Sequence, residues 1–400
     1  MELTQEKISV KNLRNNTDLG NALFIIGVIS FCFYRWYTLS AIPRMLDVPF
    51  WIKEGMPYTI FYCCLIFKVL FVDTHTKKKK IFFSIFFVYT VLNYFISGLY
   101  TEPIVYFLFL LASDSVNYKK FIKSWLITFL FFYTLMIILY FFGLTNDPQY
   151  KVGNITRRSM GFMYPTVFGA FTYCIFLAYS ILKEKYSPMY CISGLFISIS
   201  VLLLSRARTA FIIIILTTIL FTVFARIKWL SNRKILTCLS LSFPIICLIV
   251  FIVAINYNPS NATLMRLNKL LSYRIELENT AFKTIKMGLF GSRFIHAGVP
   301  DTEFYSTGKP YFFIDSFYPY IAFRFGLIAL FLLILGYTKV SLSYAKKNLW
   351  KLPVLLFIMS LACISEDRLY DFGFNPFMIF LAITLYGDYE DKNEIKGILK

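Results

Sequence analysis

Residues 235–256 read ILTCLSLSFPIICLIVFIVAIN, and the longest polar stretch of the chain, residues 257–313, follows them. As a helix, an apolar run of this length spans the roughly 30 Å hydrocarbon core of a bilayer, because each residue adds about 1.5 Å. Similar runs recur along the 400 residues, which are 58% hydrophobic and 16% charged. This composition is too apolar for a soluble domain of this size. We therefore predict an all-α, polytopic membrane protein.

Apolar segments of about 10 alternating residues, typical of a transmembrane barrel, are not the pattern here. We expect about twelve transmembrane helices in one integral membrane domain, residues 1–400. The predicted spans are residues 21–42, 57–72, 81–100, 103–117, 125–143, 160–182, 188–204, 209–225, 235–256, 314–338, 352–365 and 372–387. The polar stretch 257–313 is then a long loop inserted between the ninth and tenth spans.

The distribution of lysine and arginine predicts the orientation, because cytoplasmic loops carry an excess of both. With a cytoplasmic N-terminus, the inside segments hold 23 of these residues and the short outside loops hold eight. Both termini are therefore expected in the cytoplasm, and the 257–313 loop outside it. The net charge of +19 partly reflects this inside bias.

Several kinds of site are not expected from the sequence. The eight cysteines lie within apolar runs, which indicates packing rather than disulfides or thiolate metal ligation. The two histidines, His75 and His296, are far apart, so we expect no metal centre. No Walker motif is present. We therefore predict no cofactor, no ATP hydrolysis and no nucleic-acid partner.

Arginines at the predicted outer boundary need another explanation than topology. Arg206 and Arg208 lie between two apolar runs with almost no loop, and Arg324 falls inside the predicted span 314–338. A guanidinium at this depth is costly unless it is paired, reaches toward lipid phosphates or binds an anion. Its planar fork suits a phosphate.

The outer loop contains a candidate amphipathic helix, residues 264–286. At 100° per residue, Arg274 and Glu278 fall near the centre of its apolar face. A mutual salt bridge is the alternative to a functional role, because the two residues are four apart. Arg293 and His296 follow a glycine-containing turn. His296 is either a proton acceptor or an incidental loop residue.

The chain resembles the bacterial repeat-unit polymerases of capsule, exopolysaccharide and O-antigen synthesis, which are related to the O-antigen ligases. The resemblance covers mainly residues 200–385. It rests on Ser205-Arg206-Ala207-Arg208-Thr209, Arg274 followed by Gly288-Leu289-Phe290-Gly291-Ser292, Asp315-Ser316-Phe317-Tyr318 with Phe325-Gly326-Leu327-Ile328, and Glu366 before the last span. The ligase-like members carry a histidine near the position of Asp315.

The resemblance implies a metal-independent, inverting glycosyl transfer at the outer face of the bacterial cytoplasmic membrane. The donor would be a glycan on undecaprenyl diphosphate, and the acceptor a sugar hydroxyl of a new lipid-linked repeat unit. A flippase and a chain-length regulator would be partners, alongside membrane lipid. The implied diphosphate-binding residues are Arg206, Arg208, Arg274, Arg293 and Arg324. The implied catalytic residues are Asp315, Glu278 and His296.

Three other functions remain open from the sequence. A lipid-linked oligosaccharide flippase would also be basic with about twelve spans, but should show two related halves and short loops. An O-antigen-type ligase shares the donor chemistry. A structural membrane scaffold gives no reason for arginines near the hydrocarbon.

Overall fold

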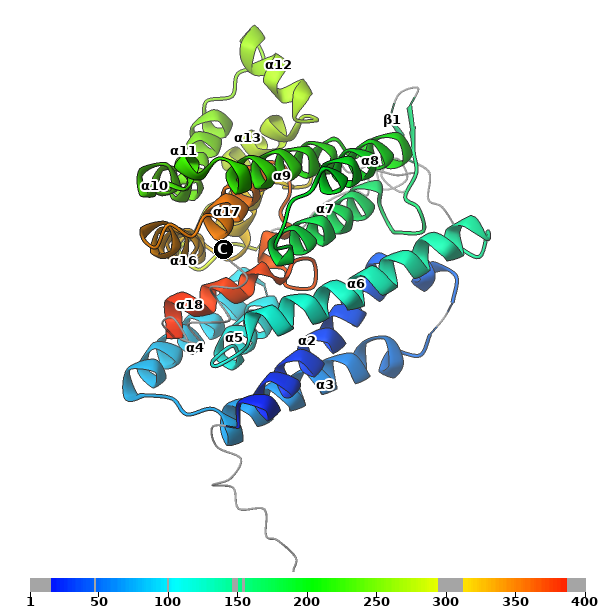
Figure 1. The fold of residues 1–400 in the computed structure, drawn as a ribbon. Coiled ribbons are helices and arrows are strands. Elements are labelled where there is room, and N and C mark those ends of the chain that lie inside the picture. The colour runs from blue at the N-terminus through cyan, green and yellow to red at the C-terminus, as the bar shows by residue number, and fades with distance from the viewer. Residues whose placement is uncertain are drawn as a thin grey trace, which may run out of the picture.

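The computed structural model describes residues 16–46, 48–98, 101–145, 150–152, 155–293 and 312–386, and these fold almost entirely into helices (Figure 1). Nine helices in this described part are long and apolar enough to cross a membrane. The prediction of an all-α, multi-pass membrane protein is confirmed at this level. The nine are Thr17–Leu39 (α2), Trp51–Val72 (including α3, Met56–Phe67), Lys79–Ser97 (within α4, Lys77–Ser97), Tyr118–Phe141 (α6), Pro165–Leu182 (α7), Pro188–Ser205 (α8), Arg208–Arg226 (α9), Arg233–Ile255 (α10, Arg233–Ser240, and α11, Ser242–Ile255) and Leu327–Lys346 (α16).

Three shorter apolar helices correspond to the remaining predicted spans: Glu102–Ala112 (α5), Lys351–Ala362 (α17) and Pro376–Tyr386, which ends in α18 (Leu381–Tyr386). Each of the twelve predicted segments therefore contains helix in its described part, while a count of twelve crossings stays a prediction. The other elements lie between spans. They are the hairpin strands β1 (Tyr150–Val152) and β2 (Ile155–Arg157), and the helices α12 (Ala262–Leu270), α13 (Arg274–Thr284) and α15 (Phe317–Arg324).

Successive helix connections gather alternately at two ends of the molecule. At one end, which we call the lysine end, Lys79 pairs with Asp114 at 3.2 Å and Lys351 Nζ donates to the carbonyl of Lys183 at 2.8 Å. At the other, the arginine end, Arg157 Nε donates to the carbonyl of Ser205 at 3.4 Å. This alternation is what a chain that crosses a membrane repeatedly requires.

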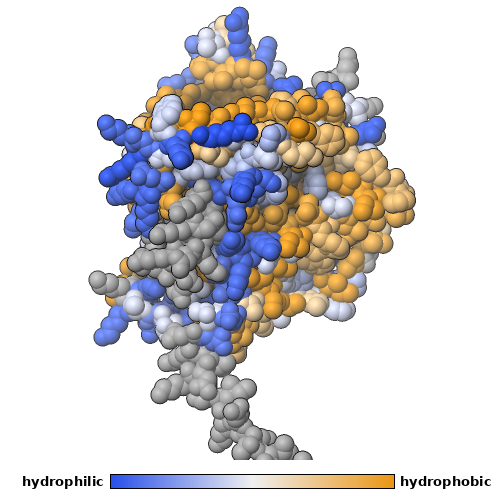
Figure 2. All heavy atoms as spheres, viewed as in Figure 1, coloured by the Kyte–Doolittle hydropathy of each residue, from blue (hydrophilic) through white to orange (hydrophobic). Residues whose placement is uncertain are grey.

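The helices differ in how much of their surface the protein itself covers. In the most apolar 18-residue stretch of α7, 78% of the residues are buried inside the protein, whereas in that of α6 only 17% are. Phe131 of α6 is 63% exposed and Phe196 of α8 is 72% exposed. Figure 2 shows hydrophilic residues gathered toward the left of the view and a broad apolar surface over much of its right half. An apolar surface of this extent is typical of contact with lipid.

The predicted span 314–338 is interrupted, which corrects the expectation that Arg324 lies inside a span. Arg324 ends α15, and Gly326, with a φ of 95°, separates it from α16. The first amides of α16 are satisfied from another segment: Leu327 N donates to the carbonyl of Gly288 at 3.1 Å. The break therefore docks the end of the long loop against the helix.

The predicted helix 264–286 is also wrong as a single element, because α12 and α13 are separated by a turn. Ser272 and Tyr273 there have φ values of 56° and 64°. Asn268 is fully buried and its Oδ1 accepts a hydrogen bond from Glu276 N at 3.2 Å, whereas Leu270 is 71% exposed. In one continuous helix Leu270 would share a face with Arg274, four residues later, and the turn removes that relation.

We predict that Gly326→Ala lowers the thermal unfolding temperature far more than Gly143→Ala. Both glycines have a positive φ, which costs an L-residue about 1–2 kcal/mol. A Cβ at Gly326 would lie 2.2 Å from the carbonyl oxygen of Leu289, while nothing lies within 4 Å at Gly143. Equal losses of unfolding temperature in detergent would show that the segment around Leu289 does not hold this break.

Candidate functional site

An ion pair between Arg274 and Asp315 organises the arginine end. Arg274 Nε lies 2.9 Å from Asp315 Oδ2, and the two side chains are 14% and 28% exposed. Arg274 opens α13, and Asp315 stands just before α15. Phe317 N donates to the carbonyl of Cys363 at 3.0 Å, which fixes the start of α15 against the end of α17. The carboxylate is thus held in place yet remains reachable.

Arg157 of β2 adds a second guanidinium to this region. Burial, followed by the positive charges of Arg274 and Arg208, lowers the pKa of Arg157, while Glu366 and Asp315 act in the opposite direction. These influences require Arg208 and Arg274 each to lie within electrostatic range of Arg157. Arg157 therefore lies among both guanidinium and carboxyl groups at the arginine end.

Arg206 and Arg208 flank a tight turn between α8 and α9. Arg206 adopts a left-handed conformation with a φ of 55°, and Arg208 is the first residue of α9. Ala207 between them is buried, and a Cβ on Gly169 of α7 would meet its Cβ at 2.6 Å. The close approach of α7 buries the alanine and leaves both arginine side chains exposed. Exposed arginines here can reach either a bound anion or lipid phosphates.

A second carboxyl-bearing turn lies beside α9. Thr209 Oγ1 and Ser365 Oγ are 2.9 Å apart. Arg368 Nη1 lies 3.8 Å from Glu366 Oε2, and Arg368 Nε lies 3.9 Å from Asp367 Oδ1. Burial raises the pKa of Asp367 to about 7 and also raises that of Glu366, although Arg368 opposes both changes. Both carboxyl groups are therefore easier to protonate than ordinary acids.

Glu278 lies under the Arg274–Asp315 pair and is only 4% exposed. Burial raises its pKa to about 8, against the opposing effects of Arg274 and of a hydrogen bond with Ser316. The Ser316 hydroxyl also donates to the carbonyl of Cys363 at 3.2 Å. The neutral form of Glu278, which burial favours, fits a positioning role better than that of a base.

The remaining predicted site residues lie elsewhere or outside the described part. Arg324 Nη2 is 2.7 Å from Glu102 Oε1, at the start of α5. Arg293 packs against the end of α4, since its Cγ would lie 3.0 Å from a Cβ on Gly98. These two arginines form a separate group over α4 and α5. His296 lies outside the described residues.

The charges at the arginine end favour an anionic ligand with several oxygens. Arg274 pairs with Asp315 and Arg157 lies near both Arg274 and Arg208, while burial raises the pKa of Glu278 to about 8 and that of Asp367 to about 7. Guanidinium groups bind phosphate oxygens in a bidentate manner. No group of three or more potential metal ligands was found in the described ranges.

Sequence reasoning placed Arg157, Asp367 and Arg368 in outer loops but did not include them in the site. The signal for Arg157 was its doublet with Arg158 on the predicted outer side, where basic residues are unexpected. The approach of the hairpin to α9 depends on tertiary packing, which the spacing of residues does not reveal.

No protein-family model, curated protein or solved structure matches this chain. The arrangement of its own residues therefore carries the functional argument.

We predict that Glu278→Gln makes the protein more stable than the wild type at alkaline pH. The folded-state pKa of about 8 exceeds the usual value of 4.5, so the folded protein binds more protons between these values. Stability from this group is full below about pH 4.5 and is lost as pH rises through about 8. The unfolding temperatures of the variant and the wild type should diverge progressively from pH 5 to about pH 8 and stay apart up to pH 9. The exposed Glu276→Gln is the control, and parallel curves for the Glu278 variant and the wild type would contradict the assignment.

Proposed function

We propose that the chain joins undecaprenyl-diphosphate-linked oligosaccharide repeat units into a surface polysaccharide at the outer face of the bacterial cytoplasmic membrane. The observation that supports this most is the group of Arg157, Arg208 and Arg274 beside Asp315, at one end of a largely apolar helical body. The diphosphate of a lipid-linked glycan lies at the depth where spans end, so its charge would meet these guanidiniums.

The reaction is a single displacement at the anomeric carbon of the donor sugar. An acceptor hydroxyl forms the new glycosidic bond, the bond from the sugar to the diphosphate breaks, and the electron pair leaves with undecaprenyl diphosphate. Arg208, Arg274 and Arg157 would stabilise the leaving diphosphate, which needs no metal ion. Attack from the opposite face inverts the anomeric configuration.

Asp315 is the group that we assign to orient the acceptor hydroxyl and take up its proton. It is 28% exposed and is held by Arg274, so an acceptor can approach a fixed carboxylate. Glu278 would support it from below in the protonated form. Arg324 is engaged by Glu102 and Arg293 lies near Gly98, so we assign the diphosphate to the Arg274 group first.

In this proposal the arginine end faces outward and both termini are cytoplasmic. A flippase would deliver the substrate, and a chain-length regulator would set the extent of polymerisation. If the chain were itself a flippase, its charges should line a path between the two ends. The described basic and acidic groups instead cluster separately at each end.

We predict that Arg274→Ala shortens the surface glycan to single repeat units. Removing one group that stabilises transition-state charge typically lowers kcat by roughly 100-fold or more. Arg274→Lys should be intermediate, because an ammonium keeps the charge but loses the bidentate fork. Glycan length is measured on gels at matched protein levels, and the exposed Arg266→Ala serves as the control.

The position of the accumulated substrate separates the alternatives. Under the polymerase proposal, lipid-linked single repeats accumulate facing outward in the Arg274→Ala strain. Inward-facing repeats would indicate transport instead, and undiminished polymer would rule out the assignment of Arg274.

A further inference from the structure

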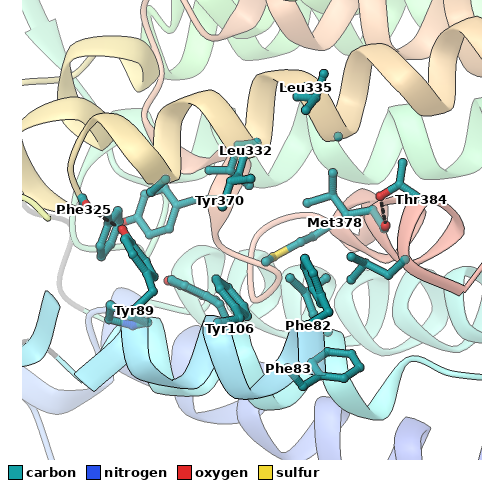
Figure 3. A pocket seen from close by; sticks show the side chains of 18 of the residues that line it. Phe82, Phe83, Tyr89, Tyr106, Phe325, Leu332, Leu335, Tyr370, Met378 and Thr384 are labelled. Carbon is teal, nitrogen blue, oxygen red and sulfur yellow. Dashed lines mark hydrogen bonds between the residues drawn. The ribbon is translucent and has the colours of Figure 1, made fainter. Parts of the chain in front are cut away.

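A groove of about 470 Å³ lies between α4, α5, α16 and the C-terminal helix, and neither Arg274 nor Asp315 lines it (Figure 3). Phe82, Tyr106, Leu332 and Met378 from these separate elements point into it. This volume lies within the range of about 300–1,000 Å³ usual for small-ligand sites. The groove is thus large enough to hold part of an amphiphile.

The lining is apolar along most of its length and charged at one end only. Lys79 of α4 and Lys339 of α16 both line it toward the lysine end. At the opposite end it is lined by Tyr89, Phe325 and Tyr370, with the Tyr89 hydroxyl donating to the carbonyl of Phe325. None of the lining residues that the structure describes is an arginine. A ligand with one anionic head and an apolar chain matches this polarity.

The two lysines leave a positive charge at their end of the groove. Lys79 Nζ is 3.2 Å from Asp114 Oδ2, but Asp114 is shared with His75, whose Nδ1 is 3.6 Å away. Lys339 has no ion pair within the part of the chain that the structure describes, and its side chain is exposed. An anionic group placed between Lys79 and Lys339 would compensate this charge.

The groove is accessible from the membrane. Phe82 and Leu332 are each 40% exposed and Leu335 is 48% exposed. Only 22% of the residues in the most apolar 18-residue stretch of α4 are buried inside the protein. A chain lying between α4 and α16 would supply packing that α4 lacks.

We propose that this groove binds one acyl chain of an anionic glycerophospholipid, with the lipid phosphate between Lys79 and Lys339. The lipid would come from the leaflet at the lysine end. The donor of the proposed polymerisation is a poorer occupant, because its diphosphate would lie at the arginine end, where none of the described lining residues is a cation. Bound in the groove with its phosphate at the lysine end, the phospholipid joins α4 to α16 and α18 and stabilises the fold.

The test is thermal unfolding of the purified, delipidated full-length protein in detergent with added lipid. Phosphatidylglycerol at about 100 times its Kd should raise the unfolding temperature by roughly 5 °C, and phosphatidylcholine with the same chains should raise it much less. The double variant Lys79→Gln with Lys339→Gln should lose the difference between the two lipids. The single variant Lys339→Gln tests the same point without disturbing Asp114.

Two further variants separate the headgroup from the chain. Ala329→Trp fills the groove and should abolish the response to both lipids. Lys234→Gln with Lys346→Gln, which removes two exposed lysines outside the groove, should respond as the wild type does. Equal responses to the two lipids, or unchanged responses in the groove variants, would overturn the proposal. Stronger, lysine-dependent stabilisation by a polyprenyl phosphate would overturn the assignment to a phospholipid.

Discussion

The ion pair between Arg274 and Asp315 connects the two sides of the long polar segment that separates α11 from α16. Arg274 is only 14% exposed at the start of α13, so its charge requires an anionic partner close by. The same constraint recurs where other charges lie near the helices. Arg35 of α2 pairs with Asp371, 336 residues away, and Lys68 pairs with Asp73 at 2.6 Å. In a body this apolar, each charge needs a partner, and the partners fix which helix ends meet.

The arginine end departs from this balance, and the departure is what gives it a function in our account. Arg157 and Arg208 bring two further guanidiniums to the Arg274–Asp315 pair, and Glu366 is the other carboxyl group that acts on Arg157. Burial raises the pKa of Glu278 to about 8 and that of Asp367 to about 7, so both carry less negative charge near neutral pH than ordinary carboxyl groups do. A fixed carboxylate within a field of guanidiniums provides both elements of glycosyl transfer, a proton acceptor and stabilisation of the leaving group.

Hydropathy was sufficient to predict the helical segments, because the length of an apolar run is set by the bilayer. It failed where tertiary contacts replace helical hydrogen bonds. Gly326 separates α15 from α16. The carbonyls of Gly288 and Leu289 accept hydrogen bonds from the first backbone amides of α16, in place of a preceding helical turn. The turn at Ser272 and Tyr273 depends on buried Asn268, which a helical wheel counts only as a polar residue.

The site was predictable only in part for the same reason. Arg274, Glu278 and Asp315 were identified because charge near an apolar face is costly, and the structure brings these three together. Their partners were not predictable, since i, i+4 spacing suggested a bridge between Arg274 and Glu278. The ion pair with Asp315 spans 41 residues, and the approach of Arg157 requires the hairpin to fold against the end of α8.

Polymerisation by the purified protein tests the central claim most directly. The protein in detergent would be incubated with one undecaprenyl-diphosphate-linked repeat unit, with EDTA and without any nucleotide. Our account predicts a ladder of glycans, each longer by one repeat, together with release of undecaprenyl diphosphate. Folded protein that binds this substrate yet leaves the single repeat unit unchanged would contradict it.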